Sequence, residues 1–395
     1  MSTGPPSTFV GWRLVAILAA AAGVSQAFGR FTYSLLFTDL RDEFRISNTV
    51  AGAIGSANLG AYVMGTLIVS LIVGRLGLGP TLRVGIVGSA SSLVVLAWSP
   101  SLAVTFLAMT TAGFFGAFVW ITAPGLATTA LGAERRGLAV GVTGAGVGAG
   151  IVAASAFAST LEPGQWRQIY VMEAGVGITV TALVVVALRN HGGAGSSTGA
   201  GQAGLASITE VPGWIGLVVA YGVFALALSL IMTFTVGVLE QDAGWAKPEA
   251  ALAFTAIGVG TVAGGPVFGP MSDRLGRARV LVIAFLVMAV AGILVPLGLR
   301  PWTVVITFVF GMAFTGVPTT VAARISDVVS AEHFGAAFGA ATLTFGMGLF
   351  IGPQLGGYLA DLTDSFKPSF VVVVGCAIVG VVIGLRQPGR REETP

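Results

Sequence analysis

The chain is poor in charge, cysteine and histidine. Of its 395 residues, only 9% are Asp, Glu, Lys or Arg, whereas a soluble domain carries about 25%. No water-soluble fold could cover so much apolar surface, which excludes a soluble protein. The single cysteine, Cys376, excludes a disulfide framework and a multi-cysteine metal site. The net charge of +3 is too small to indicate a nucleic-acid partner.

Sequence signatures of catalysis are missing as well. There is no Ser/His/Asp set, and the two histidines, His191 and His333, do not have the spacing of a metal site. The phosphate-binding pattern G-x-x-x-x-G-K-[ST] is absent, which argues against ATP hydrolysis as the energy source. We therefore expect no enzyme activity, no metal and no cofactor. The first ten residues hold no Lys or Arg, so we expect a resident first helix rather than a cleaved signal peptide.

Long apolar runs take up most of the chain. Apolar residues make up 55% of it, and the mean hydropathy is +0.91. A bilayer span needs about 20 apolar residues, so the runs predict an all-α integral membrane protein with twelve transmembrane helices. The predicted spans are residues 12–40, 48–75, 81–99, 101–131, 137–161, 167–188, 213–240, 249–272, 278–299, 301–329, 335–360 and 367–387.

The predicted helices fall into two halves, 1–189 and 213–395. Residues 190–212 between them are rich in Gly, Ser and Ala, the composition of a flexible linker. The halves resemble each other at an offset of about 200 residues, which predicts two parallel six-helix repeats with a binding site between them near the middle of the membrane. The matched residues are Arg75-Leu76-Gly77 and Arg274-Leu275-Gly276, and the glycines at 137, 141, 148 and 150 and at 335, 339, 346 and 348.

Basic residues are distributed unequally over the helix ends. Lys and Arg are about twice as frequent on the side that holds the amino terminus, the linker and the carboxyl terminus. Because basic residues concentrate on the cytoplasmic side of a membrane, both termini and the linker are expected in the cytoplasm. We expect a multi-pass protein of the plasma (inner) membrane.

A charged motif follows the eighth predicted span. The segment Gly269-Pro-Met-Ser-Asp273-Arg274-Leu-Gly276-Arg277-Ala-Arg279 combines a carboxylate with arginines at a cytoplasmic helix end. Such a carboxylate can cap neighbouring helix N-termini and pair with arginines, so Asp273, Arg274 and Arg277 are candidate gating residues. The alternative is that these basic residues only keep this side in the cytosol.

This motif resembles the signature G-x-x-x-D-R-x-G-R-[KR] of the major facilitator superfamily, and the resemblance extends over nearly the whole chain. It implies two six-helix bundles that transport a solute by alternating access. In the first half the match is degraded. Arg75 is retained as a gating candidate, but Gly74 stands at the Asp position and Leu78 at the second Arg position. We therefore expect a weaker or differently built gate at Arg75.

Two helices resemble the monocarboxylate and oxalate/formate porter branch of this superfamily. Residues 346–365 are similar to its pattern G-P-x-x-x-G-x-L-x-D-x-T-G-S, with Asp364 in place of a glycine. The segment Gly29-Arg30-Phe31-Thr32-Tyr33 is similar to a bacterial group of facilitator transporters, and several monocarboxylate porters carry a cation at a neighbouring position. The fifth span lacks the proline found in drug/proton antiporters, which disfavours multidrug efflux. Its glycine stripe suits either close packing or a bending helix.

Arg30 is the cation that lies deepest in the predicted spans. It is about 10 residues from the outer end of the first span, or about 15 Å, which is close to the middle of the membrane. Its guanidinium group stays protonated and offers a planar fork of donors suited to a carboxylate. Because charge within a bilayer is costly, Arg30 is predicted to bind an anionic substrate. The alternative is a structural arginine paired with an acid or with helix carbonyls.

Glu173 is the candidate for proton coupling. A desolvated carboxyl group inside the sixth span could take up and release a proton. It could instead be the structural partner of Arg30 or face interfacial water. Asp39 and Asp327 lie near helix ends and are expected at the interface.

Several polar side chains could line a cavity together with Arg30. Asn58 and Tyr62 are four residues apart, so they share one face of the second helix. For each residue taken singly, an interhelical hydrogen bond is the alternative explanation. The predicted substrate-binding residues are Arg30, Tyr33, Asn58, Tyr62, Trp120, Thr143, Thr233 and Gln354.

Together these features predict a secondary active transporter that moves a small, monocarboxylate-like organic anion. A gradient would drive it, through proton-coupled transport or through anion exchange. The alternative is an efflux transporter for drugs or hydrophobic metabolites, in which Arg30 is structural. The expected partners are the anionic small molecule, the lipid bilayer and protons. No nucleic-acid partner is expected, and the protein is expected to be a monomer.

Overall fold

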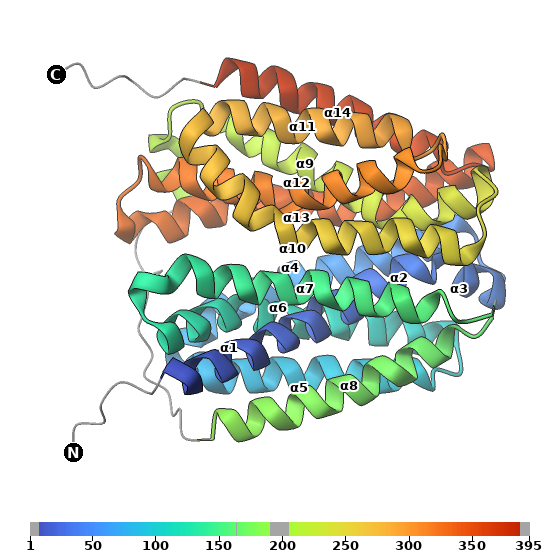
Figure 1. Ribbon diagram of the computed structural model, residues 1–395, viewed down its shortest axis with the longest axis horizontal. Coiled ribbons are helices and arrows are strands. Elements are labelled where there is room, and N and C mark those ends of the chain that lie inside the picture. Colours follow the sequence, from blue (N-terminus) through green and yellow to red (C-terminus); the bar gives the residue numbers. More distant parts are fainter. Residues whose placement is uncertain (1–7, 163, 190–204, 388–395) are drawn as a thin grey trace. The chain divides into compact units, whose positions relative to one another are not determined.

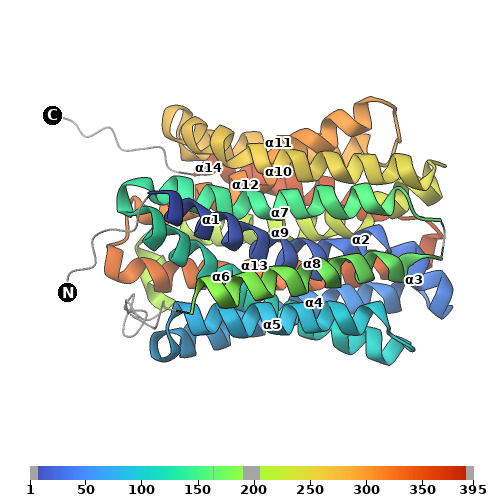
Figure 2. The ribbon, with the colours of Figure 1, turned by 60° about the horizontal axis from the view of Figure 1, so that its bottom comes forward.

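The computed structural model describes residues 8–162, 164–189 and 205–387 (Figures 1 and 2). Within these ranges twelve helices are long and apolar enough to cross a membrane. The expected all-α membrane fold is thereby confirmed. Most observed helix ends lie within a few residues of the predicted ends. The first helix differs both in where it ends and in its helix type.

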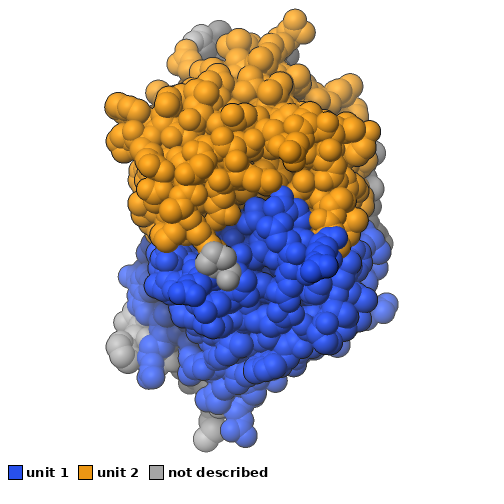
Figure 3. Space-filling view, turned by 90° about the vertical axis from the view of Figure 1, so that its right-hand side faces the viewer, with its two compact units in different colours: residues 1–45, 57–197 blue, residues 46–56, 198–395 orange. Residues whose placement is uncertain are grey.

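The chain divides into two compact units, which Figure 3 colours separately. Unit 1 comprises Met1–Arg45 and Ala57–Ser197, and unit 2 comprises Ile46–Ser56 and Thr198–Pro395. Of the predicted linker, residues 190–204 lie outside the described residues, and Leu205–Glu210 form a short 3-10 helix, η3. The two termini, residues 1–7 and 388–395, also lie outside them. The bundle boundaries and the cytoplasmic placement of the termini stay predictions.

Unit 1 is built around the first helix and its neighbours. Helix α5 lies beside α6 and α8 (Figures 1 and 2), and α1 packs against α6 and α7. The elements of unit 1 are α1 (Thr8–Ala22), the π-helix η1 (Gly23–Phe31), α2 (Thr32–Leu35), α3 (Phe37–Phe44), most of α4 (Asn48–Leu76), α5 (Leu78–Ala97), α6 (Leu102–Leu131), η2 (Ala133–Arg135), α7 (Arg136–Ala158) and α8 (Trp166–Ala187).

The first helix departs from a regular α-helix. Helix α1 continues into the π-helix η1, and the span ends at Leu35 rather than at the predicted residue 40. At the next residue, Leu36, the backbone leaves the helical region with φ −112° and ψ 4°. Gly23 and Gly29 lie within η1, and glycine weakens an α-helix by about 1 kcal/mol relative to alanine. Stretches of π-helix are rare and occur frequently at functional sites.

Two glycines of the α7 stripe allow the first helix to approach closely. A Cβ atom at Gly146 would lie 1.9 Å from the carbonyl oxygen of Ala19, and one at Gly150 would lie 2.6 Å from the Cβ of Ala27. Side chains at both positions would therefore clash. A Cβ at Gly144 would meet nothing within 4 Å. The stripe thus combines glycines required for packing with others that face open space.

Unit 2 contains the remaining helices. Helix α10 packs against α12, α9 against α13, and α11 lies beside α14 (Figure 1). A Cβ atom at Gly260 would lie 2.0 Å from the carbonyl oxygen of Phe308, so α10 and α12 are in backbone contact. Apart from η3 and the first part of α4, its elements are α9 (Trp214–Gly237), the π-helix η4 (Val238–Asp242), α10 (Lys247–Leu275), α11 (Arg277–Leu294), α12 (Trp302–Ser326), α13 (Ala331–Thr363) and α14 (Lys367–Arg386).

Candidate functional site

Arg30 lies in the π-helix η1 and stacks on an aromatic ring of α4. The central carbon of its guanidinium group is 4.2 Å from the centroid of the Tyr62 ring and 5.8 Å from that of Phe31. The Nε atom of Arg30 is buried and has no hydrogen-bond partner. None of the ion pairs found among the described residues involves Arg30. The cation is therefore stabilised by an aromatic face and is not neutralised by any carboxylate in the described part of the chain.

Asn58 binds the backbone next to Arg30. Its side-chain amide donates hydrogen bonds to the carbonyl oxygen of Gly29 at 2.8 Å and to that of Met109 at 2.7 Å. The residue is only 1% exposed. Both amide hydrogens are thereby used, and the amide joins η1 to α6. Asn58 and Tyr62, which were predicted to share a helix face, both contact the first helix, one at the backbone and one at the Arg30 side chain.

Glu173 is fully buried in α8, with 0% of its surface exposed. One of its carboxyl oxygens accepts a hydrogen bond from the hydroxyl of Thr32 in α2, and the other, Oε2, is buried without a partner. Glu173 does not form an ion pair with Arg30, which was one of its possible structural roles. The sequence prediction did not include Thr32, and its spacing from Arg30 gave no signal, because residues two apart do not share a helix face.

The other predicted substrate-binding residues do not join this group. Tyr33 is buried, and its ring meets that of Phe37 edge-on at 5.9 Å. Thr143 is buried and donates to the carbonyl oxygen of Ala139 at 2.9 Å within its own helix. Trp120 is 37% exposed. In unit 2, Thr233 is buried and Gln354 is exposed. The structure thus brings together Arg30, Asn58 and Tyr62, while a binding role for the others stays a prediction.

The charged motif forms a network at one end of unit 2. Nη1 of Arg277 donates to Oδ1 of Asp273 at 2.6 Å, and Nε donates to Oδ2 of Asp327 at 3.2 Å. Nη1 also lies 2.9 Å from the Ser272 hydroxyl. Asp327, at the end of α12, was expected only at the interface. Arg277 therefore ties together the α10, α11 and α12 ends.

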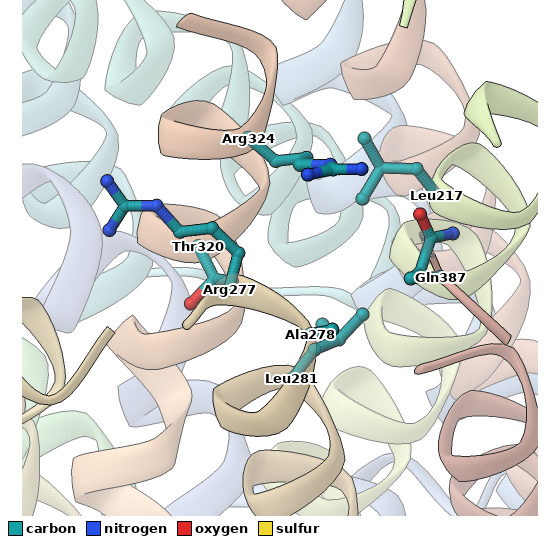
Figure 4. A pocket seen from close by; sticks show the side chains of 7 residues that line it. All are labelled: Leu217, Arg277, Ala278, Leu281, Thr320, Arg324 and Gln387. Carbon is teal, nitrogen blue, oxygen red and sulfur yellow. The ribbon is translucent and has the colours of Figure 1, made fainter. Parts of the chain in front are cut away.

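The remaining gating candidates, Arg274 and Arg75, are exposed. A small pocket adjoins Arg277 (Figure 4), and Figure 4 shows the guanidinium groups of Arg277 and Arg324 pointing in opposite directions. The two arginines do not converge on one point of this pocket. Its lining residues are Leu217, Arg277, Ala278, Leu281, Thr320, Arg324 and Gln387.

Known proteins are similar to this chain over shares of its length that differ widely. Protein ZINC INDUCED FACILITATOR-LIKE 1 of Arabidopsis thaliana is 28% identical over 37% of this chain and 30% of its own length. The class H tetracycline resistance protein of Pasteurella multocida is 32% identical over 27% of each chain. Monocarboxylate transporter 13 of Rattus norvegicus is 23% identical over 96% of this chain and 89% of its own length. The matched part of this chain thus spans only about a third of the length of the first relative.

A solved structure and a family model cover nearly the whole chain. The crystal structure of the nucleoside transporter NupG has a TM-score of 0.76 at 12% identity, and the match covers 96% of this chain and 99% of that one. It confirms the fold. The model of the family described as "Uncharacterised MFS-type transporter YbfB" matches residues 20–385. The chain therefore belongs to this family of major facilitator superfamily transporters and is a multi-pass membrane protein.

Proposed function

We propose that the protein is a secondary active transporter that moves a small, monocarboxylate-like organic anion, with Arg30 binding the carboxylate. The observation that carries this proposal is the absence of a carboxylate partner for Arg30 in the described chain, together with its buried, unpartnered Nε. A buried donor that has no hydrogen-bond partner is costly. An anionic substrate would supply the missing pair.

The stacked geometry suits this role. The Tyr62 ring covers one face of the guanidinium group, and a carboxylate approaches a guanidinium group along its edge, where the N–H donors lie. The contact with the Tyr62 ring restricts where the guanidinium group can lie, and the proposal uses its N–H donors to bind the carboxylate. Asn58 fixes the backbone beside Arg30. The monocarboxylate-like substrate is further supported by the likeness to monocarboxylate transporter 13 over most of both chains.

Energy for transport would come from a gradient. The proposal leaves two couplings, a proton carried with the anion or the exchange of one anion for another. Glu173 is the candidate proton carrier, because its Oε2 is buried without a partner in the same unit as Arg30. The proposed arrangement has two six-helix bundles, residues 1–189 and 213–395, joined by the linker 190–212. The termini and the Arg277 network would lie on the cytoplasmic side of the plasma (inner) membrane.

Efflux of drugs or hydrophobic metabolites is the second candidate function. It is supported by the likeness to a class H tetracycline resistance protein, over 27% of the chain. In that case Arg30 is a structural residue. A deletion strain separates the two functions, because drug tolerance falls if the protein exports drugs, whereas growth on a carboxylate is impaired if it imports one.

Purified protein in liposomes tests the anion site. A thermal-shift screen of small carboxylates first identifies a binding anion, whose radiolabelled form is then used for uptake. We expect Arg30→Ala to abolish both the thermal shift and the uptake, and Arg30→Lys to restore only part of them, because lysine lacks the planar fork. Arg386→Ala, which removes an exposed arginine at the end of α14, is the matched control. The anion site is wrong if Arg30→Ala binds and transports the anion as the control does.

A further inference from the structure

We propose that Asp361 is a latch that holds the amino-terminal end of α4 against α13, and that its release is a step of the transport cycle. This inference rests on the proposed transport function and assigns a residue that controls its conformational change. Oδ1 of Asp361 accepts a hydrogen bond from the backbone N–H of Asn48 at 2.8 Å, and Oδ2 accepts one from that of Thr49 at 2.8 Å. The Thr49 hydroxyl also donates to Oδ2.

The contact uses a general property of helix ends. The first N–H groups of a helix have no partner within the helix, and they carry a partial positive charge that favours a carboxylate. Here the carboxylate comes from another helix, 312 residues further along the chain than Thr49. Both oxygens of Asp361 are occupied by donors of α4. A capping contact that is normally local thus joins two distant helices.

Close backbone packing continues this contact along both helices. A Cβ atom at Gly52 would lie 2.2 Å from the carbonyl oxygen of Pro353, and one at Gly357 would lie 2.2 Å from that of Asn48. The backbone N–H of Gln354 donates to the Ser56 hydroxyl at 3.1 Å. Residues 48–56 and 353–361 therefore run antiparallel in contact over about 13 Å.

The two parts of helix α4 make different contacts, each within its own unit. The helix is continuous from Asn48 to Leu76, yet Ser56 belongs to unit 2 and Asn58 contacts Gly29 and Met109 in unit 1. The Asn58 contacts are buried, whereas Asp361 is exposed. Water can replace the hydrogen bonds of an exposed carboxylate at little cost, and it cannot reach those of Asn58. The attachment at Asp361 is therefore the one that can open and close.

The latch lies at the end of unit 2 opposite to the Arg277 network. Arg277 binds Asp327 just before α13 begins at Ala331, and Asp361 lies near the other end of that helix, about 45 Å away at 1.5 Å per residue. A transporter that works by alternating access must close each end in turn. Asp361 supplies a polar contact at the carboxyl end of α13, whereas the Arg277 network lies beside its amino end.

A cysteine reporter tests the latch without any substrate. In a Cys376→Ala background, Ser56→Cys places one thiol in the contact between α4 and α13, where Ser56 is only 3% exposed. Release of α4 would expose this thiol to a maleimide. We expect Asp361→Asn to raise its labelling rate about two- to fivefold, because asparagine keeps only one acceptor oxygen and lacks the negative charge that the helix N-terminus favours. Asp364→Asn is the matched control, because it makes the same charge change in an exposed residue one turn away, at a left-handed position that asparagine tolerates.

Equal labelling rates in Asp361→Asn and Asp364→Asn overturn the latch. If Asp361→Asn does not fold, Thr49→Val takes its place, because it keeps the carboxylate and removes only the hydrogen bond from the Thr49 hydroxyl to Oδ2. Thr49→Val should then raise the labelling rate above that of Asp364→Asn, and equal rates of these two variants overturn the proposal. These measurements report conformation alone and use no substrate. If they refute the latch, the Arg30 experiment still tests the anion site, and if the Arg30 experiment refutes the anion site, these measurements still test the latch.

Discussion

Asn58 is the residue whose removal tests how the anion site is built. We choose Asn58→Leu, which keeps a similar volume and removes both hydrogen bonds, to Gly29 and to Met109. Interhelical hydrogen bonds in membrane proteins contribute about 0.6 kcal/mol on average and at most about 1.7 kcal/mol. Two bonds therefore contribute about 1–3 kcal/mol to the free energy of unfolding.

One part of this loss is offset. The Oδ1 atom of Asn58 is buried without a hydrogen-bond partner, and removing an unsatisfied buried acceptor recovers free energy. The net destabilisation should be about 1–2 kcal/mol, a factor of 5 to 30 in an equilibrium constant. Because the Gly29 carbonyl adjoins Arg30, we expect the affinity for the transported carboxylate to fall by up to this factor.

The assay combines thermal unfolding with uptake into liposomes. Asn58→Leu should lower the midpoint of unfolding and raise KM, with kcat changed less, because the variant disturbs the binding of the anion in all states. Ser89→Ala is the control, since the Ser89 hydroxyl is also buried in unit 1 but makes no hydrogen bond that could be lost. If Asn58→Leu matches Ser89→Ala in both measurements, Asn58 does not hold Arg30 in place.

Two further substitutions probe the same unit. Tyr62→Phe keeps the aromatic face that lies 4.2 Å from the Arg30 guanidinium carbon, so its KM should stay within about twofold of the unmodified protein, whereas Tyr62→Leu should raise KM about tenfold through loss of a cation–π contact worth about 1–2 kcal/mol. Equal uptake kinetics of the two variants would refute the stacking role. Gly146→Ala should strongly lower the unfolding temperature, because its Cβ would lie 1.9 Å from the Ala19 oxygen. Gly144→Ala has open space and should be neutral or stabilising by up to about 1 kcal/mol. Similar unfolding temperatures of the two alanine variants would contradict the close approach of α7 to the first helix.

The helices were predictable because a membrane span needs a continuous run of apolar residues, which the local sequence shows directly. An apolar run such as 48–75 needs no knowledge of its neighbours, and the observed helix α4 spans Asn48–Leu76. The pairing of Asn58 with Tyr62 also followed from local spacing, since residues four apart share a face. That both would contact the first helix was not encoded in the spacing.

Contacts between distant segments were beyond the reach of sequence reasoning. Gly23–Phe31 form a π-helix whose Gly29 carbonyl oxygen accepts a hydrogen bond from Asn58, whereas an apolar run in the sequence predicts only a plain helix there. Asp361 was visible in a porter-like motif, but its partners Asn48 and Thr49 are more than 300 residues away. No pattern within a single chain links positions that are so far apart in the sequence.

The π-helix also bears on how relatives should be aligned. Its hydrogen bonds span one residue more than those of an α-helix, so each of its turns holds an additional residue. A relative with a regular first helix would be shorter by a residue in Gly23–Phe31, and its cation would appear displaced by one position while pointing in a similar direction. Comparison by helix face, rather than by sequence number, is therefore the meaningful way to ask which transporters share the charge of Arg30.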